Sequence, residues 1–429
     1  MIKNRLFFTS SITRFHKQIV KATDLKKTPN ILLSLMLLVA IATSVSCSGD
    51  EPVPPTNDDP EEEPETTEFI FGADLSYVNQ ILDQGGVYLD SGVVESPYKT
   101  FAQHGTGLAR FRLWHNPTWT KELYGDDGIQ LYNDLYDVEK GIQLARSEGM
   151  KILLDFHYSD DWADPGNQEI PAAWEDITSI QVLGDSVYNY TLKTLIYLEG
   201  RGLLPEYVQI GNETNCGMFI SNVPDGFPDC NVCEGGVANF RSVVKRGISA
   251  IREVSSTSSI NTKIILHVAD PSNVNWWFND VMNNGELTGF DIIGFSYYPI
   301  WHNTISLAGL KQNVINFKST FNKDIMIMET AYPWTNDGAD NYNNLFGGNT
   351  EIGGYPFSPE GQVAMMTKIA ESMIEAGALG MVYWEPAWIS SPMVTQWGTG
   401  SSWENSAFYD FDGNANSGFD FMTHDYSED

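Results

Sequence analysis

The sequence predicts an α/β protein built as a single (β/α)8 TIM barrel, and three observations support this. Short apolar runs alternate with longer amphipathic stretches, which is the pattern of parallel βα units. Eight such runs can be counted, and eight is the strand number of the barrel. Residues 69–429, which we expect to form the folded domain, also have a length typical of one barrel.

The expected strands are apolar runs that end in polar or aromatic residues. In order they are "IFGADLSY" (70–77), "LARFRLW" (108–114), "KILLDFHYS" (151–159), "YVQIGNE" (207–213), "KIILHVAD" (263–270), "DIIGFSYYP" (291–299), "DIMIMETAY" (324–332) and "GMVYWEPAW" (380–388). Amphipathic periodicity predicts helices between them, most plainly over 131–147, 180–199, 237–253, 307–321 and 360–376.

Residues 1–46 resemble a bacterial lipoprotein signal peptide. The apolar run from Ile31 to Ala42 is too short to span a bilayer, and it follows a positive flank that includes Lys26 and Lys27. Cys47 comes after small residues, and we expect it to be the lipidated first residue of the mature protein. An ordinary secretory signal with an incidental cysteine is the alternative.

Residues 47–68 are expected to form an acidic, proline-rich tether. From Ser48 to Glu68 Val53 is the only hydrophobic residue, so this segment cannot bury enough apolar surface to offset its ordering entropy. Together with Cys47 it predicts a lipid-anchored outer membrane protein of a Gram-negative bacterium, exposed at the cell surface. Orientation toward the inner face stays open.

The charge balance excludes several classes of partner. The chain has 56 acidic against 25 basic residues, and without residues 1–46 the balance is 55 against 18. Such an acidic protein repels polyanions, so we expect no nucleic acid partner.

The cysteines beyond the signal predict one disulfide and one free thiol. Cys216, Cys230 and Cys233 are an odd number and cannot all pair, and the sequence leaves the pairing open. A zinc site at the Cys-x-x-Cys of 230–233 is the alternative, but no second cysteine pair lies nearby.

Two apolar runs lead directly into a carboxylate. Residues 207–210 precede Asn212 and Glu213, and residues 325–328 precede Glu329. A buried carboxylate is costly without partners, and catalytic groups of a barrel sit at the carboxyl ends of its strands. Glu213 and Glu329 should therefore face each other across the mouth of the barrel.

Other strand ends carry further polar or aromatic residues that look misplaced in a core. They are Asp74, Arg112, Trp114, Asp155, His157, Tyr297, Tyr298, Trp384 and Glu385. Two opposed carboxylates with aromatic surfaces around them are the groups that glycoside hydrolysis requires.

Seven ordered motifs resemble endo-β-1,4-galactanases of glycoside hydrolase family 53, which are retaining barrel enzymes. The motifs are "GADLSYV" (72–78), "RFRLWHNP" (110–117), "LLDFHYSDDWADPGNQEIPAAW" (153–174), "VQIGNETNCGM" (208–218), "GFSYYPIWH" (294–302), "ETAYPW" (329–334) and "MVYWEPAWI" (381–389). The resemblance covers the barrel from end to end, but not the signal or the tether.

The resemblance implies that Glu213 is the general acid/base and Glu329 the nucleophile. Glu329 must stay ionised, so an arginine is its natural neighbour, and Arg112 is the candidate. Either Tyr297 or Tyr298 could donate a hydrogen bond to Glu329. We expect the carboxyl groups to lie about 5 to 5.5 Å apart, the spacing of retaining enzymes.

Substrate binding is expected from aromatic and polar side chains near these strand ends. An indole can cover the C–H patch of a β-galactoside, and Trp384 and Trp388 are the first candidates for this role. Trp301 is the next candidate, and Trp162 and Trp174 rank lower. Asn212 is expected to bind the sugar 2-hydroxyl. Asp74, Arg112, His157, Tyr297 and Tyr298 complete the predicted substrate-binding set, and His267 is open to a purely structural interpretation.

No cofactor is expected to be required, although the resemblance allows a structural calcium ion. Bacterial members can carry one between the loops after the seventh and eighth strands, and here Asp337, Asp340 and Asn344 offer oxygen ligands in the first of them. The second loop, "WGTGSSWENSAF", is poor in acids.

The sequence thus predicts retaining endo-hydrolysis of β-1,4-galactosidic links in galactan or arabinogalactan side chains of pectin. Two alternatives stay open. One is a related barrel enzyme acting on xylan, mannan or arabinosides, and the other is a surface glycan-binding protein without hydrolysis.

Overall fold

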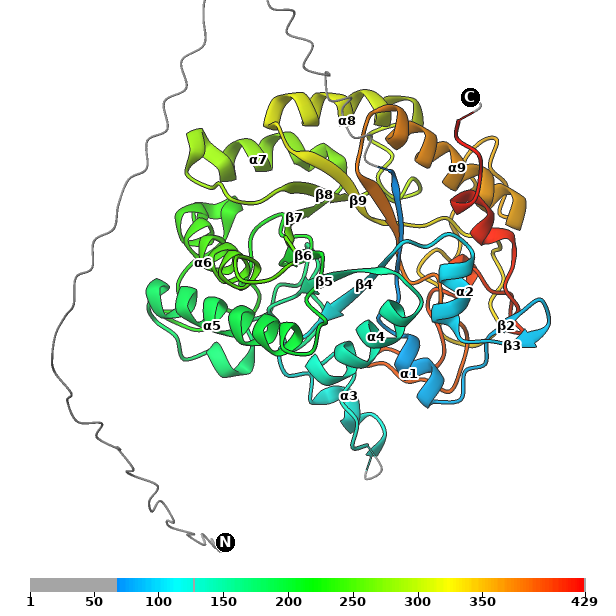
Figure 1. The fold of residues 1–429 in the computed structure, drawn as a ribbon, viewed down its shortest axis with the longest axis horizontal. Helices are drawn as coiled ribbons and strands as arrows, with labels where there is room; N and C mark the ends of the chain where they lie inside the picture. The colour runs from blue at the N-terminus through cyan, green and yellow to red at the C-terminus, as the bar shows by residue number, and fades with distance from the viewer. Residues whose placement is uncertain (1–67, 126–127, 428–429) are drawn as a thin grey trace, which may run out of the picture. The chain divides into compact units, whose positions relative to one another are not determined.

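Eight parallel strands close into a barrel in the computed structural model, which describes residues 68–125 and 128–427 (Figure 1). The strands are β1 (Ile70–Asp74), β4 (Leu108–Leu113), β5 (Lys151–Phe156), β6 (Tyr207–Ile210), β7 (Lys263–Ala269), β8 (Ile292–Ser296), β9 (Asp324–Thr330) and β10 (Gly380–Tyr383). Their order around the barrel is β1-β10-β9-β8-β7-β6-β5-β4. The predicted barrel is confirmed.

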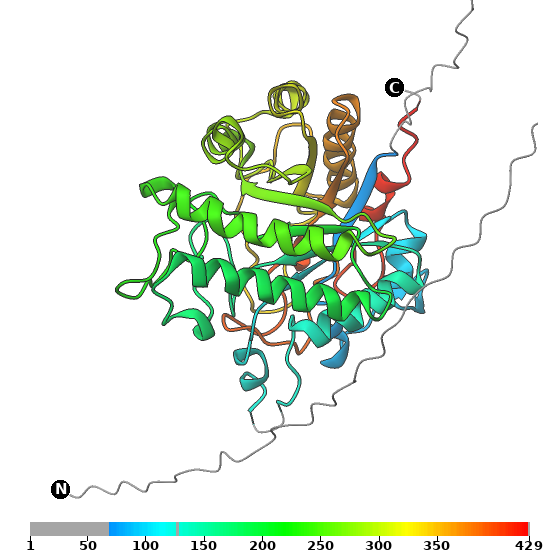
Figure 2. The same cartoon turned by 60° about the vertical axis from the view of Figure 1, so that its left-hand side comes forward.

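Helices surround the strands (Figures 1 and 2). They are α1 (Val78–Asp83), α2 (Pro97–Gln103), α3 (Trp119–Glu122), α4 (Leu135–Ser147), α5 (Ile180–Glu199), α6 (Val237–Ser255), α7 (Val274–Met282), α8 (Leu307–Phe321) and α9 (Pro359–Glu375). The five predicted helices are confirmed as α4, α5, α6, α8 and α9. A two-stranded ribbon, β2 (Leu89–Asp90) with β3 (Val93–Val94), lies outside the barrel sheet.

The interior of the barrel has an apolar floor and a polar upper layer. Every strand contributes to the floor, whose members are Ile70, Leu108, Leu153, Tyr207, Ile265, Ile292, Met326, Met328 and Val382. Because side chains alternate along a strand, Leu108, Arg110 and Arg112 share one face of β4. The apolar floor therefore carries the polar residues of the site directly above it.

A register shift in β9 directs Glu329 into the barrel. Phe295 of β8 pairs with Ile327, but the next residue, Ser296, pairs with Glu329, so Met328 is one extra residue. In such a bulge two successive side chains can face the same side. Met328 packs in the interior floor while Glu329 enters the site above it.

The cysteines confirm the predicted disulfide and free thiol. Cys216 and Cys233 form the disulfide, and Cys230 is free and buried. The alternative, a zinc site at the Cys-x-x-Cys of 230–233, is excluded because Cys233 is in the disulfide.

The predicted signal peptide, Cys47 and the tether up to residue 67 lie outside the described residues. Within the described part of the chain, no helix is long and apolar enough to cross a membrane.

Candidate active site

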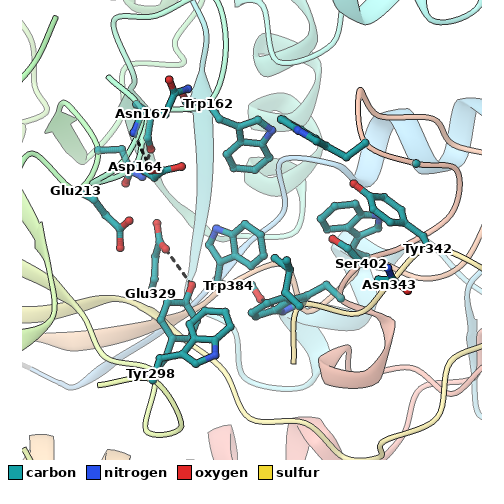
Figure 3. Close-up of a pocket in the computed structure, with 18 of the residues that line it drawn as sticks. Trp162, Asp164, Asn167, Glu213, Tyr298, Glu329, Tyr342, Asn343, Trp384 and Ser402 are labelled. Carbon is teal, nitrogen blue, oxygen red and sulfur yellow. Dashed lines mark hydrogen bonds between the residues drawn. The ribbon is translucent and has the colours of Figure 1, made fainter. Parts of the chain in front are cut away.

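Glu213 and Glu329 point toward each other at the carboxyl end of the barrel (Figure 3). Glu213 follows β6 in a left-handed conformation, with φ of +47°, and Glu329 belongs to the end of β9. Their exposed fractions are only 8% and 6%. One carboxylate oxygen of each lies within 4.8 Å of the other. This distance agrees with the spacing of about 5 to 5.5 Å expected of retaining enzymes and excludes one near 9 Å.

Arg110 of β4 connects the nucleophile candidate to three other polar side chains. Its Nη1 donates to Glu329 Oε1 (2.9 Å) and Asp74 Oδ2 (3.1 Å). Its Nη2 donates to Asp155 Oδ2 (2.7 Å) and Asn212 Oδ1 (2.8 Å). A buried guanidinium with these partners keeps a positive charge beside Glu329 and favours its ionised form.

The expectation that Arg112 is the arginine beside Glu329 is wrong. Alternation places Arg110 and Arg112 on the same face, but two residues along a strand separate them by about 6 to 7 Å. Arg112 therefore lies beyond the carboxylate layer, where its Nη1 donates to Glu385 Oε1 (2.5 Å).

The two tyrosines after β8 have different partners. Tyr298 donates from its hydroxyl to Glu329 Oε2 (2.9 Å), and Tyr297 donates to the carbonyl of Ile305 (3.0 Å). Tyr298 is thus the tyrosine that contacts Glu329, which the sequence alone leaves undecided. Glu329 receives hydrogen bonds at both oxygens, from Arg110 and Tyr298.

Glu213 has a less cationic environment than Glu329. Its Oε1 accepts a hydrogen bond from Ser296, whose Oγ lies 2.9 Å from His267 Nε2. Burial raises the pKa of Glu213 well above its usual range, and the charge of Glu329 raises it further. Burial also raises the pKa of Glu329, but Arg110 and Tyr298 lower it. The pKa of Glu213 is therefore the more strongly raised of the two.

His267 is a supporting residue whose role the sequence leaves open. Burial lowers its pKa well below the ordinary value, so the ring is neutral. Its Nδ1 lies 2.9 Å from Asn212 Oδ1. The ring thus links the side chains of Asn212 and Ser296, which lie on either side of Glu213.

Four residues predicted to bind substrate lie behind the cleft wall instead of lining it. Asp74 is bonded to Arg110, and His157 Nδ1 accepts from the backbone N–H of Ala163 (3.0 Å). Arg112 and Tyr297 are likewise buried and are not part of the lining. None of these four side chains reaches the space of the cleft.

The remaining predicted binding residues line one cleft of about 1460 Å³. Asn212, Tyr298, Trp301, Trp384 and Trp388 all contribute, and so does Trp162. Figure 3 shows Tyr298, Trp384 and Trp162 among them. Trp174 does not, because it packs against His115, Tyr190 and Phe219. The cleft combines indole faces with many carboxyl, amide and hydroxyl groups, which are the groups that bind a carbohydrate.

The sequence profile of glycosyl hydrolase family 53 matches residues 70–422. The chain belongs to this family. It is 40% identical over 349 residues to the arabinogalactan endo-beta-1,4-galactanase of Cellvibrio japonicus, covering 81% of this chain and 88% of that protein. The endo-beta-1,4-galactanase of Bacillus subtilis is 30% identical, with coverages of 80% and 78%. The solved GH53 catalytic domain of Ignisphaera aggregans has a TM-score of 0.72 at 32% identity, with coverages of 83% and 96%.

The family 53 cleft includes residues that sequence reasoning missed. Asp164 and Asn167 lie near Glu213 (Figure 3), Trp403 forms part of the wall, and Trp397 lines it with 58% of its surface exposed. Asp164 and Asn167 belong to the motif at 153–174, so the resemblance of this motif to family 53 could have identified them as site residues. Trp397 lies in a loop far from any strand end, and its exposure is visible only in the structure.

Of the three residues expected to hold calcium in the family 53 barrel, Asp340 is already hydrogen-bonded within the protein. Asp340 Oδ1 accepts from the backbone N–H of Tyr342 (2.7 Å), and Oδ2 accepts from Ser390 Oγ (2.6 Å) and the N–H of Ser401 (2.9 Å). Asp337 is exposed. The loops after β9 and β10 are therefore joined directly through Asp340.

Two oxygens of this region remain without a hydrogen-bond partner, Asn344 Oδ1 and Glu404 Oε2. Calcium takes about six to eight oxygen ligands, so two free oxygens beside an engaged Asp340 do not fit the expected ion as they stand. Within the described residues, the only three His, Cys, Asp or Glu side chains close enough to share a metal are Glu213, His267 and Glu329, which include the carboxylate pair itself.

Proposed function

We propose that this family 53 hydrolase is a retaining endo-β-1,4-galactanase that acts on galactan or arabinogalactan side chains of pectin. The observation that carries the proposal is the opposed pair Glu213 and Glu329 in an aromatic cleft. The named activities of the relatives in Cellvibrio japonicus and Bacillus subtilis support the choice of substrate.

The environments of the two carboxyls support unlike roles in a double displacement. Glu329, hydrogen-bonded by Arg110 and Tyr298, attacks the anomeric carbon and forms a covalent glycosyl-enzyme. Glu213 gives its proton to the leaving oxygen and then takes one from the attacking water. Because its pKa is raised, the carboxyl of Glu213 carries the proton that it donates in the first step. In the second step ionised Glu213 acts as the base.

Hydrolysis of a panel of polysaccharides tests this function. The purified full-length protein is incubated with galactan, arabinogalactan, xylan, mannan and arabinan, and new reducing ends are measured. We expect release from the two galactans, with an early fall in viscosity because internal bonds are cleaved. Release from xylan, mannan or arabinan alone would favour a different barrel glycosidase, and binding without release would favour a glycan-binding protein.

We further propose that the enzyme is a lipoprotein attached to the outer membrane through Cys47 and exposed at the cell surface. The apolar run before Cys47 and the acidic tether after it support this address. Substitution of Cys47→Ala should move the enzyme out of the membrane fraction and abolish labelling by a fatty-acid probe. Protease added to intact cells should remove the wild-type enzyme, and protection would contradict surface exposure.

A further inference from the structure

Arg112 lies at the centre of an aromatic cluster behind the cleft. Its guanidinium carbon is 4.1 Å from the ring centre of Tyr77 and 4.2 Å from that of Trp162. Only 1% of its surface is exposed. Nε and Nη2 have no hydrogen-bond partner, which fits a planar cation held between aromatic faces.

Glu385 is the carboxyl partner of Arg112, and it connects to two tryptophans of the cleft. Its Oε1 accepts from Arg112 Nη1 (2.5 Å). Trp384 immediately precedes it, and the N–H of Trp388 donates to its carbonyl (3.1 Å). Glu385 has a φ of +50°, a conformation that a non-glycine residue keeps only when its surroundings hold it.

The ion pair therefore contacts one tryptophan ring of the cleft wall directly and is connected to two others. Trp162 stacks on Arg112. Trp384 and Trp388 are joined to the backbone of Glu385, and the ring centre of Trp388 also lies 4.6 Å from that of Tyr77, the other ring on Arg112. The ring centres of Trp162 and Trp384 lie 6.0 Å apart, and those of Trp384 and Trp388 lie 6.4 Å apart. These rings form one surface, so moving either ion displaces indoles that face the cleft.

We propose that Arg112 and Glu385 are positioning residues that set the geometry of the tryptophan wall and thereby the affinity for the sugar chain. The proposal rests on the proposed galactan-binding function. A cation fits this place because it can stack on two rings and bond a carboxylate at the same time, which an apolar side chain cannot do.

The two arginines of β4 have different partners, and this difference predicts different effects on binding and on the chemical step. Arg110 contacts Glu329, but no hydrogen bond or ion pair joins Arg112 to Glu213 or Glu329. Asp74 links the two arginines, because its Oδ1 lies 3.9 Å from Arg112 Nη1 and its Oδ2 accepts from Arg110. Ser76 reinforces this link, since its hydroxyl accepts from the backbone N–H of Arg112 and donates to Asp74. Loss of the Arg112 geometry should therefore weaken sugar binding and leave the chemical step nearly intact.

The test compares Arg112→Lys and Glu385→Gln in the full-length protein. Lys keeps the charge but loses the planar stack, and Gln keeps the shape but loses the charge. Binding of a β-1,4-galacto-oligosaccharide is measured by calorimetry in the Glu329→Gln background, and kcat is measured at saturating galactan with Glu329 intact. We expect Kd to rise about tenfold, because the displaced indoles must be ordered again before the sugar chain can stack on them, while kcat changes less than about threefold.

Arg241→Lys provides a matched control, because Arg241 is also a buried arginine with a carboxylate partner, Glu286. It lies on α6 and does not line the cleft. This control should lose thermal stability without any change in Kd. The tryptophan emission spectrum should shift in Arg112→Lys and stay unchanged in Arg241→Lys.

Three results would overturn the proposal. If Arg112→Lys and Glu385→Gln lower the melting temperature but bind the oligosaccharide like their parent, the pair is merely structural. If kcat falls while Kd stays constant, the pair acts through the carboxylates instead. If the parent Glu329→Gln protein does not bind the oligosaccharide at all, the proposed function fails, and this inference fails with it. Should one variant not fold, the other still decides among these results.

Discussion

At the scale of single residues, the proposed mechanism requires that two similar carboxyls have different protonation states. Arg110 and Tyr298 each donate a hydrogen bond to Glu329, whereas Glu213 receives one from the neutral hydroxyl of Ser296. Hydrogen bonds to a charged donor are the stronger ones, so the ionised form is favoured at Glu329. These unlike neighbours support the proposed assignment of Glu213 as the acid and Glu329 as the nucleophile.

Replacing Glu329 with Gln should abolish hydrolysis while keeping the fold. The amide has nearly the same shape but cannot form the covalent intermediate, and loss of a nucleophile costs several kcal/mol of transition-state stabilisation. Initial rates on galactan should fall far below about a tenth of the wild-type value. A variant with unchanged circular dichroism and more than that activity would rule out Glu329 as the nucleophile.

The same substitution should lower the pKa of Glu213. The negative charge of Glu329 raises that pKa, and Gln carries no charge, so Glu213 should release its proton at a lower pH in Glu329→Gln. Carbon-13 NMR of the labelled carboxyl can follow this titration in both proteins. In the wild type, kcat/KM should fall as pH rises through the pKa of Glu213. An unchanged Glu213 titration would contradict the coupling of the two groups.

The sequence predicts which residues gather at the carboxyl end of the barrel, but not how far along the barrel each side chain lies or which partner it contacts. Glu213 and Glu329 could be predicted because each ends an apolar run. The arginine that contacts Glu329 could not be predicted, because alternation assigns both Arg110 and Arg112 to one face of β4 and does not say which of them reaches the carboxylates. The choice between Tyr297 and Tyr298 depends on the turn after β8, which local sequence does not fix.

At the scale of elements, the long amphipathic helices and the barrel strands were predictable, and the irregular segments were not. The four missed helices, α1, α2, α3 and α7, are short and offer too few residues for a clear period. Each of the eight strands ends earlier than the run that predicted it, because the last residues of the run, such as Trp384 and Trp388, belong to the following loop. The bulge at Met328 re-aims Glu329 through tertiary pairing with β8.

The joined loops after β9 and β10 give a prediction at this scale. Asp340 bonds Ser390 and Ser401, and its loop forms part of the cleft wall. Asp340→Ala should lower the melting temperature by a few degrees and raise KM, since loss of charged hydrogen bonds costs about 1.5 to 3 kcal/mol.

Chelation is the matched control for Asp340→Ala. Treatment with EDTA should change neither the melting temperature nor KM, because protein donors already occupy the Asp340 carboxylate. A clear rise of the melting temperature on adding calcium would contradict this and would favour the calcium site suggested by the family resemblance.

At the scale of the whole molecule, charge should influence which galactan the enzyme reaches. Residues 69–429 carry 46 acidic against 18 basic residues. Such a surface repels the anionic polygalacturonate backbone of pectin but not a neutral side chain far from it.

Salt dependence tests this effect. Activity on galactan still attached to pectin should rise with moderate salt, because screening shortens the range of the repulsion. Activity on detached neutral galactan should stay constant and serves as the control. A flat response on both substrates would remove charge repulsion as a determinant of substrate choice.

The central claim is that Glu329 forms a covalent bond to the sugar, and trapping this intermediate tests it most directly. A 2-deoxy-2-fluoro-β-galactoside with a good leaving group slows the second step, so the labelled enzyme can be digested and sequenced by mass spectrometry. We predict one added glycosyl group on the peptide that contains Glu329, and proton NMR should show the β-anomer as the first product of galactan hydrolysis. A label on another residue, or an α-anomer as the first product, would contradict the account.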